Sequence, residues 1–109
     1  MANVYKILGQ SAPGATTDTD LYTVPSATES VISTIIIANR ASSAGTFRIA
    51  LRPDGNAISN AYYIAYDVPI AANDSTTLTL GITLDAADVV TVQCSSADMT
   101  VSIFGTEIS

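Results

Sequence analysis

Histidine is absent from this sequence of 109 residues, and the chain holds a single lysine, Lys6, near its start. Histidine is the commonest general base and metal ligand in proteins, so an activated serine would lack its usual partner here. The sequence has no glycine-rich phosphate-binding loop. Asp18 and Asp20 lack the glycine and distant glutamate of a calcium-binding loop and are expected to shape a solvated turn. We therefore expect no catalytic site, no cofactor and no metal, and predict that the protein is not an enzyme.

Positive charge is also scarce, because four basic residues stand against ten acidic ones and the net charge is −6. Binding to nucleic acid or to anionic lipid needs clustered lysine and arginine. The first residues show no basic segment followed by an apolar run, and no run approaches the ~18 apolar residues of a membrane span. We expect no signal peptide, and neither nucleic acid nor a membrane as a partner.

Cys94 is the only cysteine, which excludes a disulfide within the chain. It lies in phase with Val90 and Val92 in an apolar segment. No histidine or lysine lies nearby in the sequence to stabilise a thiolate. A buried, inert side chain is therefore favoured over a reactive thiol.

The most prominent feature that is present is the run VISTIIIAN at 31–39, the longest dense stretch of β-branched residues. Such residues are typical of strands. Strict alternation would place Ile35 and Ile37 on one face and Ile32 and Ile36 on the other. Both faces would then be apolar, which predicts a central strand covered on both sides or packed against another subunit.

The rest of the chain has the pattern of short strands separated by glycine, proline, asparagine and aspartate turns. Segment 46–52 alternates most cleanly, with Phe47, Ile49 and Leu51 directed to the core. In segment 75–84, Leu80 is expected on the inner face, and Gly81 predicts a bulge or bend. The strands are predicted at 4–8, 21–24, 31–39, 46–52, 62–68, 75–84, 89–95 and 99–108.

Regular strand and turn spacing over this length indicates one all-β domain spanning 1–109. We predict a single-domain β-sandwich of about eight short antiparallel strands, jelly-roll-like in topology. An immunoglobulin-like sandwich is the alternative. Its Cys–Trp–Cys hallmark is impossible in this chain, which has no tryptophan and one cysteine.

Arginine and tyrosine side chains are the candidates for a contact surface. Arg48 and Arg52 lie on one side of a predicted strand and could pair with a neighbouring subunit or with aspartates of the same chain. Alternation places Tyr62 and Tyr66 on one face and Tyr63 on the other, so one set is expected in the core and the other at a binding surface. The candidate interface residues are Arg40, Arg48, Arg52, Tyr62, Tyr63 and Tyr66.

Five segments together resemble small virion proteins of tailed bacteriophages, particularly those of marine and cyanobacterial phages. These segments are LYTVP (21–25), TIIIANR (34–40), TFRIALRP (46–53), YIAYD (63–67) and FGTEI (104–108). The similarity covers most of the chain, and the shared motifs are structural.

The resemblance implies a capsid decoration, or cement, protein. Such a protein binds the major capsid protein or other virion proteins on the outer head surface as a homo-oligomer, with a trimer favoured. Its location would be the virion, after synthesis in the cytoplasm of the bacterial host. The alternative is a β-sandwich module of a tail, baseplate or fibre that binds carbohydrate or a receptor. A charged fraction of only 13% suits an assembled subunit, because few charges need desolvating at its contacts.

Overall fold

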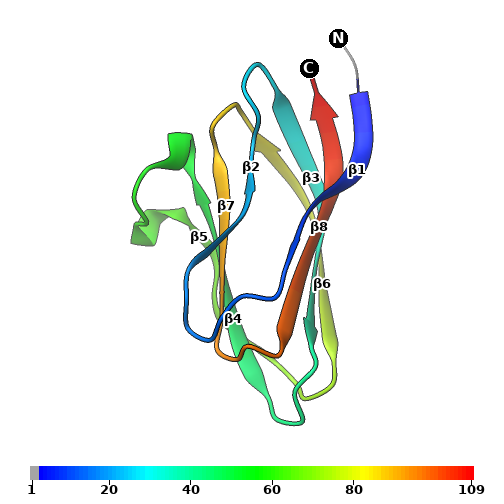
Figure 1. Cartoon of the computed structure of the whole chain (residues 1–109), viewed down its shortest axis with the longest axis vertical. Coiled ribbons are helices and arrows are strands. Elements are labelled where there is room, and N and C mark those ends of the chain that lie inside the picture. Colours follow the sequence, from blue (N-terminus) through cyan, green and yellow to red (C-terminus); the bar gives the residue numbers. More distant parts are fainter. Residues whose placement is uncertain (1–2) are drawn as a thin grey trace.

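The computed structural model describes residues 3–109 and confirms the all-β prediction, with eight antiparallel strands in two sheets (Figure 1). All eight predicted strands are present; 75–84 and 99–108 match the prediction at both ends, and the other six differ from it at one or both ends. Two short 3₁₀ turns, η1 (Pro53–Gly55) and η2 (Asn60–Tyr62), precede the fifth strand. No helix in the described part of the chain could cross a membrane. The strands are β1 (Asn3–Ser11), β2 (Thr19–Thr23), β3 (Glu29–Asn39), β4 (Gly45–Arg52), β5 (Tyr63–Ile70), β6 (Ser75–Leu84), β7 (Val89–Cys94) and β8 (Met99–Ile108).

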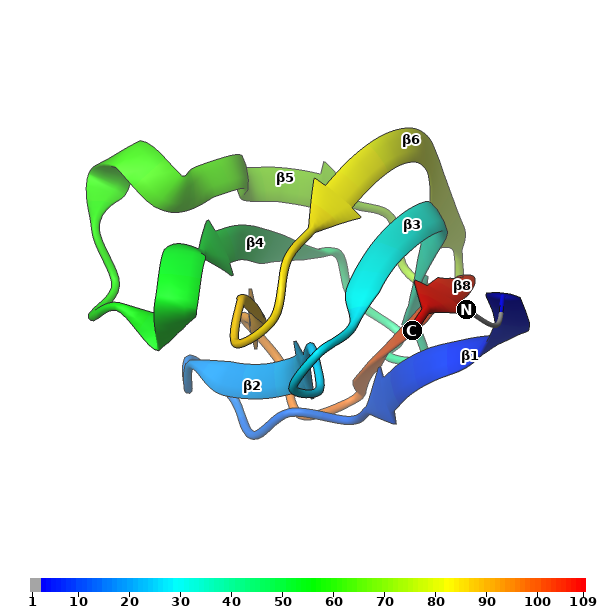
Figure 2. The same cartoon turned by 90° about the horizontal axis from the view of Figure 1, so that it is seen from above.

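The two sheets have the strand orders β1-β8-β3-β6 and β2-β7-β4-β5. Strand β1 pairs with β8, β2 with β7, β3 with β6 and β4 with β5, as in one long antiparallel ribbon folded over on itself. This is the order of a jelly roll, so the immunoglobulin-like alternative is wrong. Figure 2 shows the two layers from above, with β3 and β6 in one and β4 and β5 in the other.

The core lies between the two sheets and is built from alternate residues of β3, β4, β7 and β8. Cys94 is buried in phase with Val90 and Val92, as predicted. Burial raises the pKa of the Cys94 thiol to about 11, so the thiol stays protonated at neutral pH. The largest fully buried side chains include Phe47, Ile32, Ile35, Ile37, Ile49, Met99 and Ile103.

A row of β-bulges crosses the sheet that contains β8. Strand β8 passes through this row without an extra residue, whereas its pairing partners carry insertions. The extra residues are Leu8 in β1, Ser33 in β3, and Leu80 with Gly81 in β6. Bulges bend and twist a strand, and β3 and β6 arch visibly in Figure 2.

These insertions correct two predictions about side-chain direction. The extra residue Ser33 reverses the phase of β3, so Ile32 joins Ile35 and Ile37 in the core, and the strand has one buried and one partly exposed face. Strict alternation was wrong here because an insertion interrupts the period of two. Leu80, predicted to face inward, is exposed because it belongs to the bulge of β6, whereas the predicted bulge at Gly81 is confirmed.

Gly105 of β8 lies where the row of bulges brings two backbones together. A Cβ atom at this position would clash with the carbonyl oxygen of Val31 on β3. The obstacle is backbone, which cannot rotate away as the end of a flexible side chain could. Gly105 is therefore required for the close approach of β3 and β8.

Replacing Gly105 tests whether this approach is needed. We expect Gly105→Ala to lower the free energy of unfolding by about 1–3 kcal/mol, because the added methyl group must displace the β3 backbone. The matched control is Gly81→Ala in the same row, where nothing lies within 4 Å of the added Cβ. It should change stability by less than about 0.5 kcal/mol. Urea denaturation measures the free energy of unfolding of both variants. An equal loss of stability in Gly105→Ala and Gly81→Ala would contradict a special requirement for glycine at position 105.

A polar cluster closes one end of the sandwich. Glu107 of β8 accepts bonds from Lys6 Nζ at 2.7 Å and from the Tyr22 hydroxyl at 2.5 Å. The Tyr22 oxygen also lies 2.7 Å from Ser30 Oγ. The hydrogen bond from Lys6, followed by that from Tyr22, lowers the pKa of Glu107. Burial, together with the bond to Glu107, raises the pKa of Tyr22 to about 12. The cluster ties together β1, β2, β3 and β8.

The Glu107 cluster predicts a pH dependence in acid. Because the pKa of Glu107 is lower in the folded chain than its unfolded value of about 4.3, its contribution is present above that value and is lost as pH falls through the folded pKa. Glu107→Gln should lower stability at neutral pH and flatten the acid limb of a stability–pH curve. The control is Glu29→Gln at an exposed position of β3. An acid limb unchanged by Glu107→Gln would refute the assignment.

Candidate functional site

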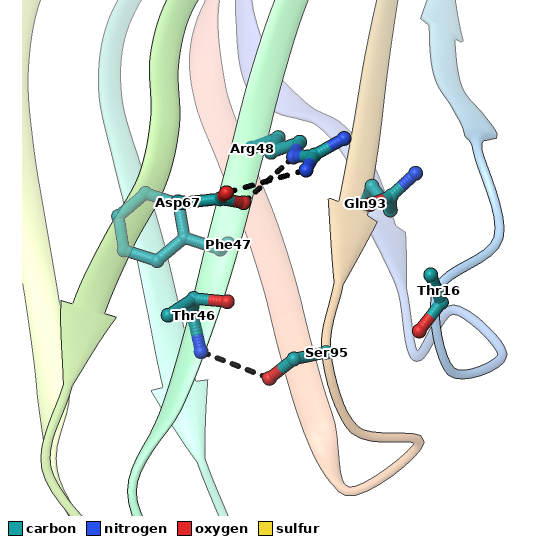
Figure 3. Close-up of a pocket in the computed structure, with 7 residues that line it drawn as sticks. All are labelled: Thr16, Thr46, Phe47, Arg48, Asp67, Gln93 and Ser95. Carbon is teal, nitrogen blue, oxygen red and sulfur yellow. Dashed lines mark hydrogen bonds and ion pairs between the residues drawn. The ribbon is translucent and has the colours of Figure 1, made fainter.

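The outer face of the β2-β7-β4-β5 sheet holds a small polar pocket with a volume of about 130 Å³ (Figure 3). Its walls come from β4, β5, the end of β7 and the connection between β1 and β2. The strands fix these walls, because neighbouring backbones are hydrogen-bonded along the sheet. The lining residues are Thr16, Thr46, Phe47, Arg48, Asp67, Gln93 and Ser95.

Arg48 is the central group of this pocket and is held on two sides. Its Nε donates to Asp67 Oδ1 at 2.7 Å and its Nη2 to Asp67 Oδ2 at 3.2 Å, as Figure 3 shows. The guanidinium lies over the ring of Tyr66, 4.0 Å from the ring centroid. The bonds from Arg48 lower the pKa of Asp67, so the pair is ionised and internally neutral at pH 7. Both contacts fix the guanidinium plane.

A bulge in β5 brings Asp67 and Tyr66 to the same arginine. Asp67 has a left-handed backbone with φ of 52°, and the register of β5 against β4 shifts at this point. Consecutive strand residues normally point to opposite faces, but here both contact Arg48. A second register shift follows beside Ala65. It accompanies an edge-on contact between the rings of Tyr63 and Tyr66, with centroids 4.9 Å apart.

The opposite wall of the pocket is formed by Gln93 and Thr16. Gln93 pairs in register with Arg48, and its Nε2 donates to Asp18 Oδ1 at 2.8 Å, leaving its Oε1 available to another donor. The backbone nitrogen of Thr16 donates to the carbonyl oxygen of Cys94 at 2.8 Å, which holds the β1–β2 connection against β7. The pocket thus combines a guanidinium, an amide and hydroxyl groups.

The remaining arginines lie outside this pocket. Arg52 donates to Asp20 Oδ1 at 2.8 Å and to the carbonyl oxygen of Gly55 at 2.9 Å, which fastens η1 to the sheet. Arg40 follows β3 and donates to Thr100 Oγ1 at 3.0 Å. Of the six candidate interface residues, the structure brings together Arg48, Tyr63 and Tyr66 and places Arg40, Arg52 and Tyr62 elsewhere.

Two further predictions can be compared with the structure. Alternation wrongly separated Tyr63 from Tyr66, because the bulges in β5 change the phase and Tyr62 belongs to η2. Asp18 and Asp20 do not converge on one point, since each carboxylate accepts from a different side chain. Within residues 3–109, no three histidine, cysteine, aspartate or glutamate side chains gather where a metal ion could bind.

Several pocket residues were missed from the sequence. Asp67 carried a usable signal, because aspartate is depleted in strands and tolerates the left-handed backbone of a bulge. Gln93, Thr16 and Ser95 carried none, since polar residues at strand ends and in connections are common.

No protein-family model matches this chain, and no curated protein is significantly similar to it. The groups in the pocket suit hydrogen bonding to a ligand, and their fixed positions suit recognition.

Two substitutions at Asp67 test whether the ion pair serves stability. Asp67→Gly removes the pair but also the left-handed strain, so its unfolding midpoint in urea should equal or exceed that of the wild type. Asp67→Ala removes the pair and keeps a strained backbone, so its midpoint should fall. If Asp67→Gly lowered the unfolding midpoint as much as Asp67→Ala does, the ion pair between Asp67 and Arg48 would itself contribute to stability.

Proposed function

We propose that this chain is a structural protein of a virion: a capsid decoration protein of a tailed bacteriophage that binds the outer head surface as a homo-oligomer and stabilises it. The resemblance of its segments to small virion proteins supports this proposal. A jelly-roll sandwich with few charges also suits a subunit that works by packing against others.

The observation that carries the proposal is the exposed apolar edge of the β1-β8-β3-β6 sheet. Strand β1 is an edge strand, and along the described residues it pairs with β8 alone. Tyr5 is 80% exposed and Ile7 is 51% exposed. Soluble proteins usually protect such edges with charges, prolines or a covering segment. The one charge here, Lys6, is engaged with Glu107. The edge is therefore suited to contact with another protein.

A second copy of the chain is the proposed occupant of this edge. Ile7 lies directly opposite Phe104 of β8, so the apolar surface continues from the edge onto the outer face of the sheet. A shallow groove of about 510 Å³ runs there between Tyr5, Ile7 and Phe104. The free hydrogen-bonding edge of β1 can accept a strand of a neighbouring copy, while the groove receives its side chains. We propose that the strand added to β1 comes from a different edge of the neighbouring copy, because such a head-to-tail contact forms a ring, as a trimer requires, when the rotation between copies closes.

Many weak contacts are enough for a decoration protein. Each subunit of a ring offers its own contact to the head, so the contacts of one ring act together. A modest affinity per copy then supports firm attachment. An acidic surface, with net charge −6, also avoids adhesion to DNA.

Substituting the exposed edge tests the proposal. Wild-type protein should form a trimer in native mass spectrometry and light scattering, and Ile7→Lys should give a folded monomer because the added charge would be buried at the contact. The matched control is Ile58→Lys, an apolar residue outside the sheet that is 41% exposed, which should stay trimeric.

The proposed location of the protein in the virion requires a second measurement. Mass spectrometry of purified virions should find the chain in copy numbers expected of a head protein. Wild-type protein that stays monomeric at high concentration and is missing from virions would overturn the proposal. A stable dimer would contradict the trimer.

A further inference from the structure

Backbone strain marks the pocket around Arg48 as more than a stabilising feature. Asp67 is the one left-handed residue other than glycine that lies inside a strand, among the residues that the structure describes. A left-handed backbone costs free energy for a residue with a Cβ atom. The ion pair that it positions is partly solvent-exposed, with the Arg48 side chain 25% and the Asp67 side chain 49% exposed, so solvent screening limits its contribution to stability. The cost of the strained backbone has an explanation if Asp67 fixes the Arg48 side chain in the orientation that binds a ligand.

The free hydrogen-bonding groups of the pocket are mixed in kind. Across residues 3–109, Nη1 of Arg48 has no protein acceptor, because the bonds to Asp67 use Nε and Nη2. Gln93 Oε1 is an acceptor on the neighbouring strand. The hydroxyl of Thr16 can donate and accept, and Ser95 Oγ, which already accepts from the backbone nitrogen of Thr46 at 2.9 Å, can still donate. Closely set donors and acceptors match a ligand whose own groups do both, as the hydroxyl groups of a sugar do.

The charge and the volume of the pocket limit the class of ligand that it can bind. Arg48 is neutralised by Asp67, so the pocket offers no net positive charge to an anion. The net charge of −6 repels anionic ligands over longer distances. A volume of about 130 Å³ is small beside the roughly 300–1,000 Å³ of sites for drug-sized ligands. A neutral ligand about the size of one sugar ring fits both limits.

An aromatic side chain lies beside these polar groups. Tyr66 is 54% exposed, and its position against Arg48 is fixed by the stacking contact. Tyrosine supplies apolar area together with a polar hydroxyl, which suits a ligand with a C–H face and hydroxyl groups at its edge. We propose that the pocket between Arg48, Gln93 and Thr16 binds one ring of a neutral carbohydrate, with Tyr66 next to the pocket where its ring stacks on the Arg48 guanidinium.

The test is a titration of isotopically labelled full-length protein with glucose, galactose, mannose and N-acetylglucosamine, followed by amide chemical shifts. Sugar concentrations should reach roughly 50 mM, since a small pocket with few contacts gives millimolar affinity. We expect at least one sugar to cause saturable shifts centred on Thr16, Arg48, Asp67 and Gln93. No saturable shift with any of the four would overturn the proposal.

Matched variants assign the binding to the pocket. Arg48→Met keeps an unbranched side chain against Tyr66 but removes the donors, and it should weaken binding about tenfold. Arg40→Met, outside the pocket, should bind like the wild type. If Arg48→Met does not fold, as its spectrum would show, Gln93→Ala takes its place with the same expected loss. Undiminished binding by the folded variant, or tighter binding of glucuronic acid than of the neutral sugars, would refute the proposed site.

The carbohydrate site and the proposed assembly role can fail separately. The pocket lies on the outer face of one sheet, whereas Ile7 belongs to the edge strand of the other. The Ile7→Lys variant should therefore bind sugar with the affinity of the wild type. Loss of sugar binding in that variant would contradict a pocket contained within one chain.

Discussion

The close approach of β3 and β8 at Gly105 is the constraint on which much of the structure depends. Strand β8 has no extra residue in the row of bulges, whereas the other three strands of its sheet, β1, β3 and β6, each carry one or two. The added residues shift the register of β3 against β8 and β6, and β3 and β6 arch over the core (Figure 2). It also turns Ile32 inward, beside Ile35 and Ile37. A side chain at Gly105 would collide with backbone, so the arch needs glycine at this point.

The β2-β7-β4-β5 sheet also contains bulges, but there they arrange groups on the surface. Strand β5 is an edge strand, and its insertions leave the core side of β4 undisturbed, with Phe47 and Ile49 buried. On the outer side they direct Tyr66 and Asp67 to Arg48. Insertions in a central strand therefore shape the core, whereas insertions at an edge arrange surface groups. An edge strand tolerates this because one of its sides has no pairing to lose.

Local pattern was enough to predict the eight strands, the inward face of β4 and the burial of Cys94, because each depends on residues close together in the sequence. The faces of β3 and β5 could not be predicted in that way. Their phase depends on extra residues that exist only relative to a partner strand distant in the sequence. A glycine inside a strand, such as Gly81, indicates a bulge in the sequence itself, whereas Ser33 is a residue type that ordinary strands contain. The pocket was hidden for the same reason, since Arg48, Asp67 and Gln93 meet only through pairing across three strands.

The jelly roll sets the two candidate surfaces on different sheets. The apolar edge at Tyr5 and Ile7 belongs to the β1-β8-β3-β6 sheet, and the Arg48 pocket to the outer face of the other. The shared core between the sheets keeps them in fixed relation, because interiors packed this closely do not deform freely. A subunit joined to a neighbouring copy through its β1 edge would leave the outer face of the second sheet open to ligand. In a ring of subunits that pocket would be repeated once per copy, and a weak interaction with a sugar-bearing surface would gain strength from repetition. Attachment to a particle and recognition of a carbohydrate are therefore compatible roles for one small domain.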